Sequence, residues 1–452
     1  MSYGILTLLP ILVIIVMAVI TKKSFESLIV GSVVASIIMY GIGFLPHWVD
    51  SILTAVSTTD NQWVILVCGL FGSLIAMLRE SHGTNGFSAW GEKLCKNEKT
   101  TLLGTLIMGI VIFVDDYLNM LTVGTCMRKI CDRRKVPREA LAYVLDSTGT
   151  PVCVLLPFST WTAFYITLFM KEDGVKALGF SSGISMYLHT MPYIFYAIAT
   201  VAIVFLFIFG IMPKLGGMKK AYDRVKTTGR TYSEASTKFN IDDESDNVPG
   251  NIWDFVIPIA VLILVTVFQG DMLLAVIVTL VVCLLLYVPR KIMSIAEWCN
   301  LLISGFCEML PTLAILVGAF TVANICNTMG LPEYIISAVT PYLNAQTFAV
   351  IIFIVVSILT FATSSTWGVS TIVVPIIIPL ASAVGANMLL TMAAILSGST
   401  FGSHACFYSD ATVLASTASR IENLEHASSQ IPYALIAAAV SCIGFVVCGF
   451  VI

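Results

Sequence analysis

Charged residues are scarce in this chain of 452 residues. Only 11% of the residues are Asp, Glu, Lys or Arg, whereas 58% are hydrophobic and the mean hydropathy is +0.93. A soluble globule of this length needs far more polar side chains to cover its surface. The composition therefore excludes a soluble protein and predicts a multi-pass protein of the cell membrane, embedded in the lipid bilayer. No feature of the sequence indicates a nucleic-acid partner.

The groups of Cys and His residues that are typical of redox and transition-metal sites are also missing. The sequence has no cluster of histidines, and its cysteines lack the spacing of metal ligands. We therefore expect no cofactor and interpret the cysteines of the apolar runs as small side chains that face lipid or the core. They are Cys68, Cys153, Cys283, Cys406, Cys442 and Cys448.

Apolar runs of about 20 residues, the length of a membrane-spanning helix, recur along the chain. Two further apolar regions, 101–170 and 346–418, are interrupted by clusters of Gly, Pro, Ser, Thr and Asp. A helix that breaks at such a cluster leaves backbone groups without partners, which a membrane tolerates only inside protein or beside a cavity. The sequence thus predicts an all-α membrane fold with two broken regions. The predicted uninterrupted spans are 4–21, 27–45, 62–78, 190–211, 252–269, 271–288, 299–320 and 429–452.

The positions of Lys and Arg indicate how the first broken region is threaded. If residues 101–127 crossed the membrane once, the basic segment 128–139 would lie opposite the basic segment 91–100, contrary to the positive-inside rule. A re-entrant hairpin over 101–127 keeps both segments in the cytoplasm. With the N-terminus outside, every Lys and Arg except Lys171 and Lys176 is then cytoplasmic. The polar segment 212–250 is predicted to be a cytoplasmic linker between two halves.

Similar motifs occur in the same order in the two halves. FVDDYLN at 113–119 parallels FATSSTW at 361–367, and LDSTGTP at 145–151 parallels LSGSTFG at 396–402. Because the first half starts outside and the second inside, the pattern predicts two repeats of inverted topology. Chance similarity among apolar helices is the alternative, since few residues are identical. The predicted first repeat is 1–211, with a hairpin at 101–127 and a broken helix at 140–170, and the second is 251–452, with a hairpin at 346–382 and a broken helix at 388–418.

Two adjacent aspartates, Asp115 and Asp116, lie within an apolar segment. A carboxylate at the centre of a bilayer costs about 2.5 to 3.5 kcal/mol, and two neighbouring ones repel each other, so their presence indicates a function. Burial and repulsion favour protonation of one of them, so that a proton and a cation compete for the same oxygens. The cation and the proton are then exchanged if the site can cross the membrane only when one of them is bound.

Hairpin tips and broken helices that meet near the midplane form a recurrent type of transport site. Carboxylate, hydroxyl and carbonyl oxygens suit a hard cation such as Na+. The predicted cation- and proton-binding residues are Asp115, Asp116, Asn119 and Asp146, with Na+ itself at Asp115, Asp116, Asn119, Ser364 and Ser365. The predicted substrate- or ion-binding residues are Ser147, Thr148, Thr150, Ser364, Ser365, Thr366, Ser399, Thr400, Ser403, His404 and Asp410.

Each of these residues also has a structural interpretation. Ser and Thr in membrane helices commonly form hydrogen bonds with their own helix or a neighbouring one. His404 is equally compatible with a structural histidine, and Asp410 with a cap of the helix that follows the break. For the Asp115 and Asp116 pair a purely structural role is the weaker interpretation.

Four motifs resemble those of the NhaC-type sodium/proton antiporter family, within the ion transporter superfamily. They are FVDDYLNMLTVGT, LDSTGTPVCVLLPFSTW, SSTWGVS and GSTFGSHACFYSDAT, and the resemblance covers nearly the whole chain. It implies an inverted-repeat fold with two re-entrant hairpins, a homodimer formed through a scaffold domain, and an elevator-like movement of a transport domain. The family also includes carriers that resemble malate/lactate exchangers, so the resemblance leaves the substrate open.

Two transport functions therefore compete. The first is Na+/H+ antiport, with Na+ and H+ as coupling ions, and the second is Na+- or H+-coupled transport of a small amino acid or organic acid. Aromatic residues near the breaks are suited to line an organic ligand, but no Lys or Arg is expected inside the membrane to bind its carboxylate. This absence favours a cation or an amine-bearing solute held by Asp115 or Asp116, while hydroxyl groups and helix N-termini remain an alternative way to hold a carboxylate. The aromatic residues are Phe158, Trp161, Phe164, Trp367 and Tyr408.

Two other classes of protein remain as alternatives. An intramembrane aspartyl protease needs two carboxylates that share a water molecule, and adjacent residues of a helix or strand point apart, so only Asp115 with Asp146 could serve. A channel is the other alternative. We expect a secondary transporter rather than an enzyme.

Overall fold

The computed structural model is all-helical and describes every residue except 1–2, 22, 114, 158, 240–247 and 270. Five helical stretches of the described chain are long and apolar enough to cross a membrane: Phe25–Ser57, Asn61–Glu80, Leu310–Thr328, Thr366–Val384 and Asn423–Val451. Two bent helix pairs raise this number to as many as seven. They join Arg138–Leu155 to Thr160–Phe169 at 44° and Gly183–Tyr193 to Phe195–Ile208 at 56°.

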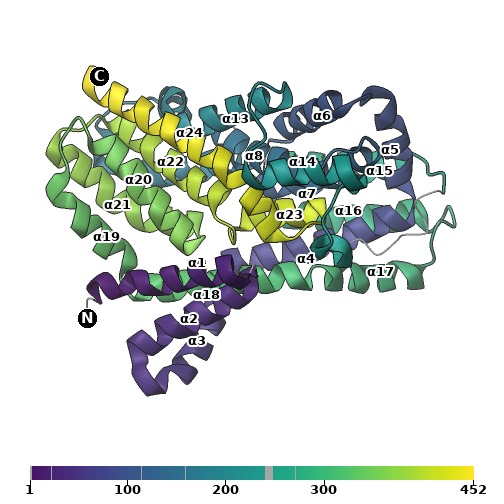
Figure 1. The fold of residues 1–452 in the computed structure, drawn as a ribbon, viewed down its shortest axis with the longest axis horizontal. Helices are drawn as coiled ribbons and strands as arrows, with labels where there is room; N and C mark the ends of the chain where they lie inside the picture. Colours follow the sequence, from purple (N-terminus) through teal and green to yellow (C-terminus); the bar gives the residue numbers. More distant parts are fainter. Residues whose placement is uncertain (1–2, 22, 114, 158, 240–247, 270) are drawn as a thin grey trace.

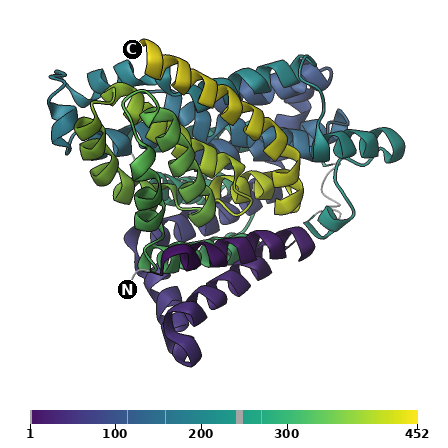
Figure 2. The ribbon, with the colours of Figure 1, turned by 60° about the vertical axis from the view of Figure 1, so that its left-hand side comes forward.

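The helices divide into two groups by their contacts. In the first group α4 packs against α16 and α17, α15 against α16, and α18 against α2 and α3. Figures 1 and 2 show α1 to α3 at the edge of the molecule, with the α2–α3 hairpin projecting from it. The first group comprises α1 (Leu9–Thr21), α2 (Ser24–Tyr40), α3 (Phe44–Ser57), α4 (Thr59–Glu80), α15 (Trp253–Gln269), α16 (Met272–Tyr287), α17 (Ile295–Glu308) and α18 (Leu310–Thr328).

Small residues hold α4 and α17 together. A Cβ atom at Gly305 would lie 2.6 Å from the carbonyl oxygen of Gly72 and 2.6 Å from the Cα atom of Ser73. The Ser73 hydroxyl donates a hydrogen bond to the carbonyl of Leu302 at 2.6 Å. Helices in membranes associate closely where small residues let their backbones approach. This contact joins the N-terminal and C-terminal halves of the chain.

The second group surrounds the interrupted regions of the sequence. Helices α7, α8, α22 and α23 are its most deeply buried members. The group comprises α6 (Glu98–Val111), α7 (Asp116–Arg133), α8 (Arg138–Thr148), α9 (Thr150–Leu155), α10 (Thr160–Phe169), α11 (Asp173–Lys176), α12 (Gly183–Thr190), α13 (Phe195–Ile208), α14 (Gly216–Thr228), α20 (Phe348–Thr363), α21 (Thr366–Val384), α22 (Met388–Ala405), α23 (Asp410–Ser419) and α24 (Asn423–Val451).

Two short helices connect the groups. Helix α5 (Gly83–Leu94) leads from α4 to α6, and α19 (Leu331–Val339) leads from α18 to α20. Each begins after a residue in the left-handed backbone region, His82 with φ 54° and Gly330 with φ 77°. Glycine adopts this region without steric cost, whereas a histidine does so less readily.

The start of α5 packs closely against the beginning of the second half of the chain. A Cβ atom at Gly250 would lie 1.7 Å from the carbonyl oxygen of His82, and one at Gly86 would lie 2.5 Å from the backbone nitrogen of Ile252. The Asn85 amide donates to the carbonyl of Val248 at 2.9 Å. The backbones are therefore in direct contact at this point.

Helix breaks recur at a constant distance along the chain. Helix α7 begins at Asp116 and α21 at Thr366, 250 residues later, and α10 and α23 begin at Thr160 and Asp410, again 250 residues apart. The serines that cap α10 and α23 also have matching contacts. Ser159 donates to the carbonyl six residues earlier and accepts from the backbone N–H of Thr162, and Ser409 makes the same pair of contacts.

The structure has three features that were not predicted from the sequence. The predicted span 299–320 covers two helices, because α17 ends at Glu308 and α18 begins at Leu310, next to Pro311, whose ring suits the first turn of a helix. Helix α3 was not predicted. Within 212–250, α14 packs against α24 and buries Met218, Ala221 and Tyr222, although no apolar periodicity was recognised there.

Candidate functional site

Asp115 is the N-cap of α7. Its Oδ1 atom accepts hydrogen bonds from the backbone N–H groups of Tyr117 and Leu118, both at 3.0 Å. Its Oδ2 atom accepts one from the Thr160 hydroxyl, at 3.1 Å, from the start of α10. The helix begins here because a carboxylate satisfies N–H groups that have no partner in the first turn, and the positive end of the helix dipole favours its charge.

Asp116 is the first residue of α7 and is equally buried, with both aspartates 4% exposed. Its Oδ2 atom accepts a hydrogen bond from Thr150 at 2.9 Å, and the same hydroxyl lies 3.5 Å from that of Ser403. The structure gives the second carboxylate oxygen of Asp116 no hydrogen-bond donor among the described residues. Helices α7, α9 and α22 therefore meet at this carboxylate.

Asp410 brings a third carboxylate to the same region. The hydroxyl of Tyr117 donates to its Oδ2 atom, and the N–H of Ala411 donates to its Oδ1 atom at 2.8 Å. Asp410 is the first residue of α23, whereas the cap of that helix is Ser409. Asp410 therefore lies beside Tyr117 as the first residue of α23, and not as the cap that the alternative interpretation expected.

No Lys or Arg among the described residues forms an ion pair with Asp115, Asp116 or Asp410. Their partners are hydroxyl and backbone N–H groups. A buried carboxylate that lacks a cationic partner is costly unless it is protonated or binds a cation. The site is therefore chemically suited to hold either protons or a hard cation at carboxylate and hydroxyl oxygens.

Asn119 holds the helix breaks in place. Its amide nitrogen donates to the carbonyls of Ile112 at 2.9 Å and Thr148 at 3.2 Å, and also to that of Gly109. Its buried Oδ1 atom has no hydrogen-bond partner among the residues that the structure describes. The side chain thus ties the end of α6 to the end of α8 and leaves one oxygen available as a ligand.

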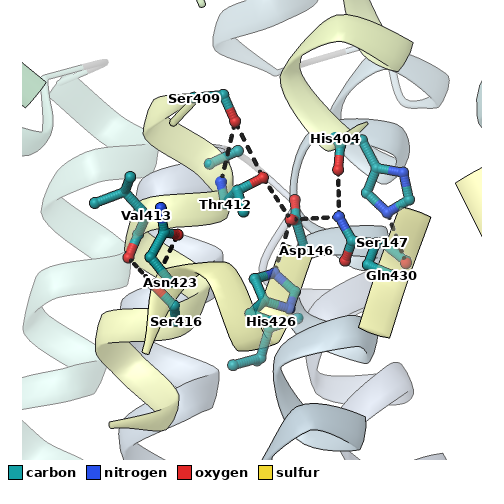
Figure 3. Close-up of polar contacts among 12 residues, drawn as sticks. Asp146, Ser147, His404, Ser409, Thr412, Val413, Ser416, Asn423, His426 and Gln430 are labelled. Atoms are coloured by element: carbon teal, nitrogen blue, oxygen red, sulfur yellow. Dashed lines mark hydrogen bonds and ion pairs between the residues drawn. The ribbon is translucent and has the colours of Figure 1, made fainter. Parts of the chain in front are cut away.

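Asp146 belongs to a fully buried network that adjoins the carboxylate cluster. Thr412, which donates to Asp146, also lies 3.4 Å from the Ser403 carbonyl, and the Ser403 hydroxyl contacts Thr150. Figure 3 shows this carboxylate from α8 between side chains of α23 and α24. Its Oδ2 atom accepts hydrogen bonds from Thr412 at 3.1 Å, from Gln430 at 2.7 Å, and lies 3.0 Å from Nε2 of His426. Its Oδ1 atom accepts no hydrogen bond within the described part of the chain. The predicted grouping of Asp146 with Asp115 and Asp116 has no support in a direct contact.

His404 links this network to α13. Its Nε2 atom lies 2.9 Å from the Ser147 hydroxyl, and its Nδ1 atom lies 2.7 Å from the Tyr196 hydroxyl. The Gln430 amide donates to the His404 carbonyl. Both ring nitrogens therefore have protein partners.

The second break lies next to α10, the helix whose first residue, Thr160, bonds to Asp115. Ser364 adopts a left-handed conformation with φ 55°, and the buried hydroxyl of Thr366 has no hydrogen-bond partner among the described residues. The ring centroids of Trp367 and Trp161 are 5.1 Å apart, and those of Trp367 and Phe164 are 4.3 Å apart. Among the described contacts, none joins Ser364, Ser365 or Thr366 to Asp115 or Asp116.

The predicted hydroxyl ligands divide into two kinds. Thr148 donates to the carbonyl of Val144 at 2.8 Å and Thr400 to that of Leu396 at 2.7 Å, so both bond to their own helices. Ser399 instead contacts Ser370 at 3.1 Å, on α21. Thr148 and Thr400 therefore make the hydrogen bonds to their own helices that were given above as the alternative to ligand binding.

Several residues of these clusters were not predicted from the sequence. Tyr117 and Thr160 complete the carboxylate cluster, and His426 and Gln430 complete the Asp146 network. Spacing offers a clue only for the last two, which lie four residues apart and so share one face of α24. Two motif positions, Val114 and Phe158, lie outside the described residues.

Arg128 begins the segment 128–139, which was predicted to be cytoplasmic. Its side chain is buried in the last third of α7, because this helix continues to Arg133 and keeps Arg128 inside the helix packing.

Comparisons of sequence and structure identify known proteins that are similar to this chain. An uncharacterized protein of Haemophilus influenzae is 28% identical over 488 aligned positions, which cover 99% of this chain and 92% of the relative. The malate-2H(+)/Na(+)-lactate antiporter of Bacillus subtilis is 28% identical over 151 positions, 33% of this chain and 32% of that protein. A solved structure of Neisseria gonorrhoeae MtrF, reported to illuminate a class of antimetabolite efflux pumps, aligns with this chain at 12% sequence identity and a TM-score of 0.36. The alignment covers 91% of this chain and 85% of the MtrF chain.

A family model settles the broader classification. The model of the Na+/H+ antiporter family matches residues 152–450, which include the broken helices α22 and α23 and most of the second half. Members of this family are membrane transporters and not enzymes, so the protease alternative is set aside. The chain belongs to the Na+/H+ antiporter family, as its motifs suggested.

Proposed function

We propose that this chain exchanges Na+ for H+ across the cell membrane by alternating access. The observation that carries the proposal is the cluster of Asp115, Asp116 and Asp410, three carboxylates that are held by hydroxyl and N–H groups without a cationic partner. Such a cluster is stable when it holds either protons or a cation, and occupancy by one displaces the other.

The residues around the cluster have distinct roles in this mechanism. Asp115 and Asp116 bind Na+, and Thr150 and Thr160 donate hydrogen bonds that favour the ionised carboxylates. The free Oδ1 atom of Asn119 supplies a further oxygen ligand. When Na+ leaves, protons neutralise the carboxylates, so that an empty charged site does not cross the bilayer.

The second break closes the site in another state of the cycle. Ser364, Ser365 and Thr366 lie in the second hairpin, and the unpaired hydroxyl of Thr366 supports a role as a ligand that becomes engaged when the second group moves. Helices α5 and α19, each starting at a left-handed residue, connect that group to the first. They are suited to act as the arms of an elevator-like movement.

The repeated spacing of 250 residues supports an inverted-repeat architecture. Helices α7 and α21, and α10 and α23, start at equivalent positions of the two proposed repeats. In this arrangement the N-terminus is outside, the hairpins 101–127 and 346–382 enter from opposite sides, and the linker 212–250 is cytoplasmic. The first group then forms the scaffold through which two copies of the chain associate.

Proteoliposomes that enclose a pH-sensitive dye test the proposal. We expect external Na+ to drive proton movement in the wild type and not in the double variant Asp115→Asn, Asp116→Asn. The matched control is Asp173→Asn, because the Asp173 side chain is 98% exposed and pairs with Lys176. Proton movement that persists in the double variant would refute the proposed site.

A second function is Na+- or H+-coupled transport of a small amino acid or organic acid. The similarity to the malate-2H(+)/Na(+)-lactate antiporter favours it, as does the aromatic cluster of Trp161, Phe164 and Trp367 beside the second break. In the same assay this function predicts no proton movement with Na+ alone and a response once an organic solute is added.

A further inference from the structure

A cavity of about 850 Å³ lies between the two helix groups. Its wall includes residues of α4, α17 and α18 from the first group and of α7 and α23 from the second. Ile75, Met309 and Ile315 give the first-group side an apolar character, and Leu121 and Val413 do so on the opposite side. The volume is within the range of sites for small organic ligands.

The acidic residues of the cavity wall all have basic partners. Each of the three carboxylates forms an ion pair with a Lys or Arg of the same wall. The pairs are Glu26 with Lys23 at 2.8 Å, Glu308 with Arg79 at 2.6 Å, and Glu422 with Lys238. These acids are therefore already neutralised and do not make the cavity negative.

Arg128 differs from the other basic residues of the wall. Its side chain is 9% exposed and donates one hydrogen bond, from Nη1 to the carbonyl of Ala418 at 3.3 Å. No carboxylate among the described residues pairs with it, and the nearby Asp132 pairs with Arg138 at 2.8 Å. A guanidinium group has five N–H donors, so most of those of Arg128 are left without a protein acceptor.

The position of Arg128 connects the cavity to the carboxylate cluster. Tyr117, Leu121 and Arg128 lie on one face of α7, since they are four and seven residues apart. Leu121 and Arg128 line the cavity, and Tyr117 contacts Asp410. From Tyr117 to Arg128 the helix rises about 16 Å. A ligand in the cavity thus lies along the helix that carries both aspartates.

We propose that Arg128 binds the carboxylate group of a small organic acid in this cavity. The planar guanidinium matches a carboxylate with two parallel hydrogen bonds, and the apolar residues of the wall accept the carbon skeleton. This inference rests on the second function proposed above and assigns its substrate class and a binding residue. The carboxylate would neutralise Arg128 while the coupling ions occupy the aspartates.

Calorimetric titration of the purified full-length protein in nanodiscs tests the site. The probes are L-lactate and L-malate, with inorganic phosphate and chloride as anions that lack a carbon skeleton. We expect one of the acids to bind the wild type and the control Arg230→Gln, which changes an exposed arginine outside the cavity wall. Arg128→Gln should weaken this binding at least tenfold, and Arg128→Lys, which keeps the charge but loses the planar fork, by a smaller factor.

Several outcomes would overturn the assignment. They are the absence of binding by either acid, binding that is unchanged in both Arg128 variants, and equal binding of phosphate or chloride through Arg128. The melting temperature of each variant in the same nanodiscs reports whether it is folded. Proton movement in proteoliposomes, recorded with Na+ alone and with Na+ plus the acid, separates failure of the anion site from failure of the proposed coupled transport.

Discussion

The hydroxyl of Thr150 offers the most direct test of how the site holds its charge. Thr150 donates to Oδ2 of Asp116 at 2.9 Å, whereas Thr148, two residues earlier, donates to carbonyls of its own helix. Replacing either residue by valine removes one hydroxyl and retains the branched shape. The pair of variants thus separates the carboxylate contact from general effects on helix packing.

The expected magnitude follows from the hydrogen bond that is lost. A hydrogen bond to an ionised group contributes about 1.5 to 3 kcal/mol. The bond stabilises the ionised, Na+-binding form of Asp116 more than the protonated form, so its removal favours the proton over Na+. At 1.4 kcal/mol for each factor of ten, Thr150→Val should raise the half-saturating Na+ concentration about 10- to 100-fold at fixed pH.

Sodium-driven proton movement in proteoliposomes, measured over a range of Na+ concentrations, gives this quantity. We expect Thr148→Val to stay within about twofold of the wild type, since its hydroxyl bonds only to backbone carbonyls. If Thr150→Val binds Na+ as the wild type does, the hydroxyl does not support the carboxylate. If both variants lose affinity equally, the effect arises from packing and the reasoning is refuted.

Three further predictions concern stability. Gly305→Ala should lower the free energy of unfolding by about 1 to 3 kcal/mol, because its methyl group meets backbone atoms, whereas Gly104→Ala, which has space, should not lower the melting temperature. Asp146→Ala should cost about 3 to 5 kcal/mol because three buried groups lose their acceptor, and an unchanged melting temperature would contradict the network. Na+ at 100 times its dissociation constant should stabilise the wild type by about 2.7 kcal/mol in thermal unfolding and leave the Asp115→Asn, Asp116→Asn variant unaffected.

The residue types at three helix breaks allowed these breaks to be predicted from the sequence. Clusters of Gly, Ser, Thr and Asp mark the ends of α6, α20 and α22, because these residues compete with helical hydrogen bonds or leave the backbone free to turn. The break between α17 and α18 was missed because apolar residues continue through it. Only the first-turn preference of Pro311 distinguishes it from a continuous span.

The sequence indicated which types of residue form the candidate site, but not which side chains contact one another. Asp116 and Thr150 are in direct contact, whereas Asp146 is linked to them only through Thr412 and Ser403. Which side chains meet depends on how α8, α23 and α24 pack, and a single sequence contains no record of those contacts. His426 was therefore not foreseen, although it lies against Asp146.

The contact between Gly250 and His82 has a mechanical consequence. Because the two backbones touch, α5 cannot rotate about residue 82 without pushing on the segment that opens the second half of the chain. That segment leads directly into α15, which packs against α5. The start of this connecting helix is thus packed against the opposite half of the chain, so a displacement there would be transmitted to both halves.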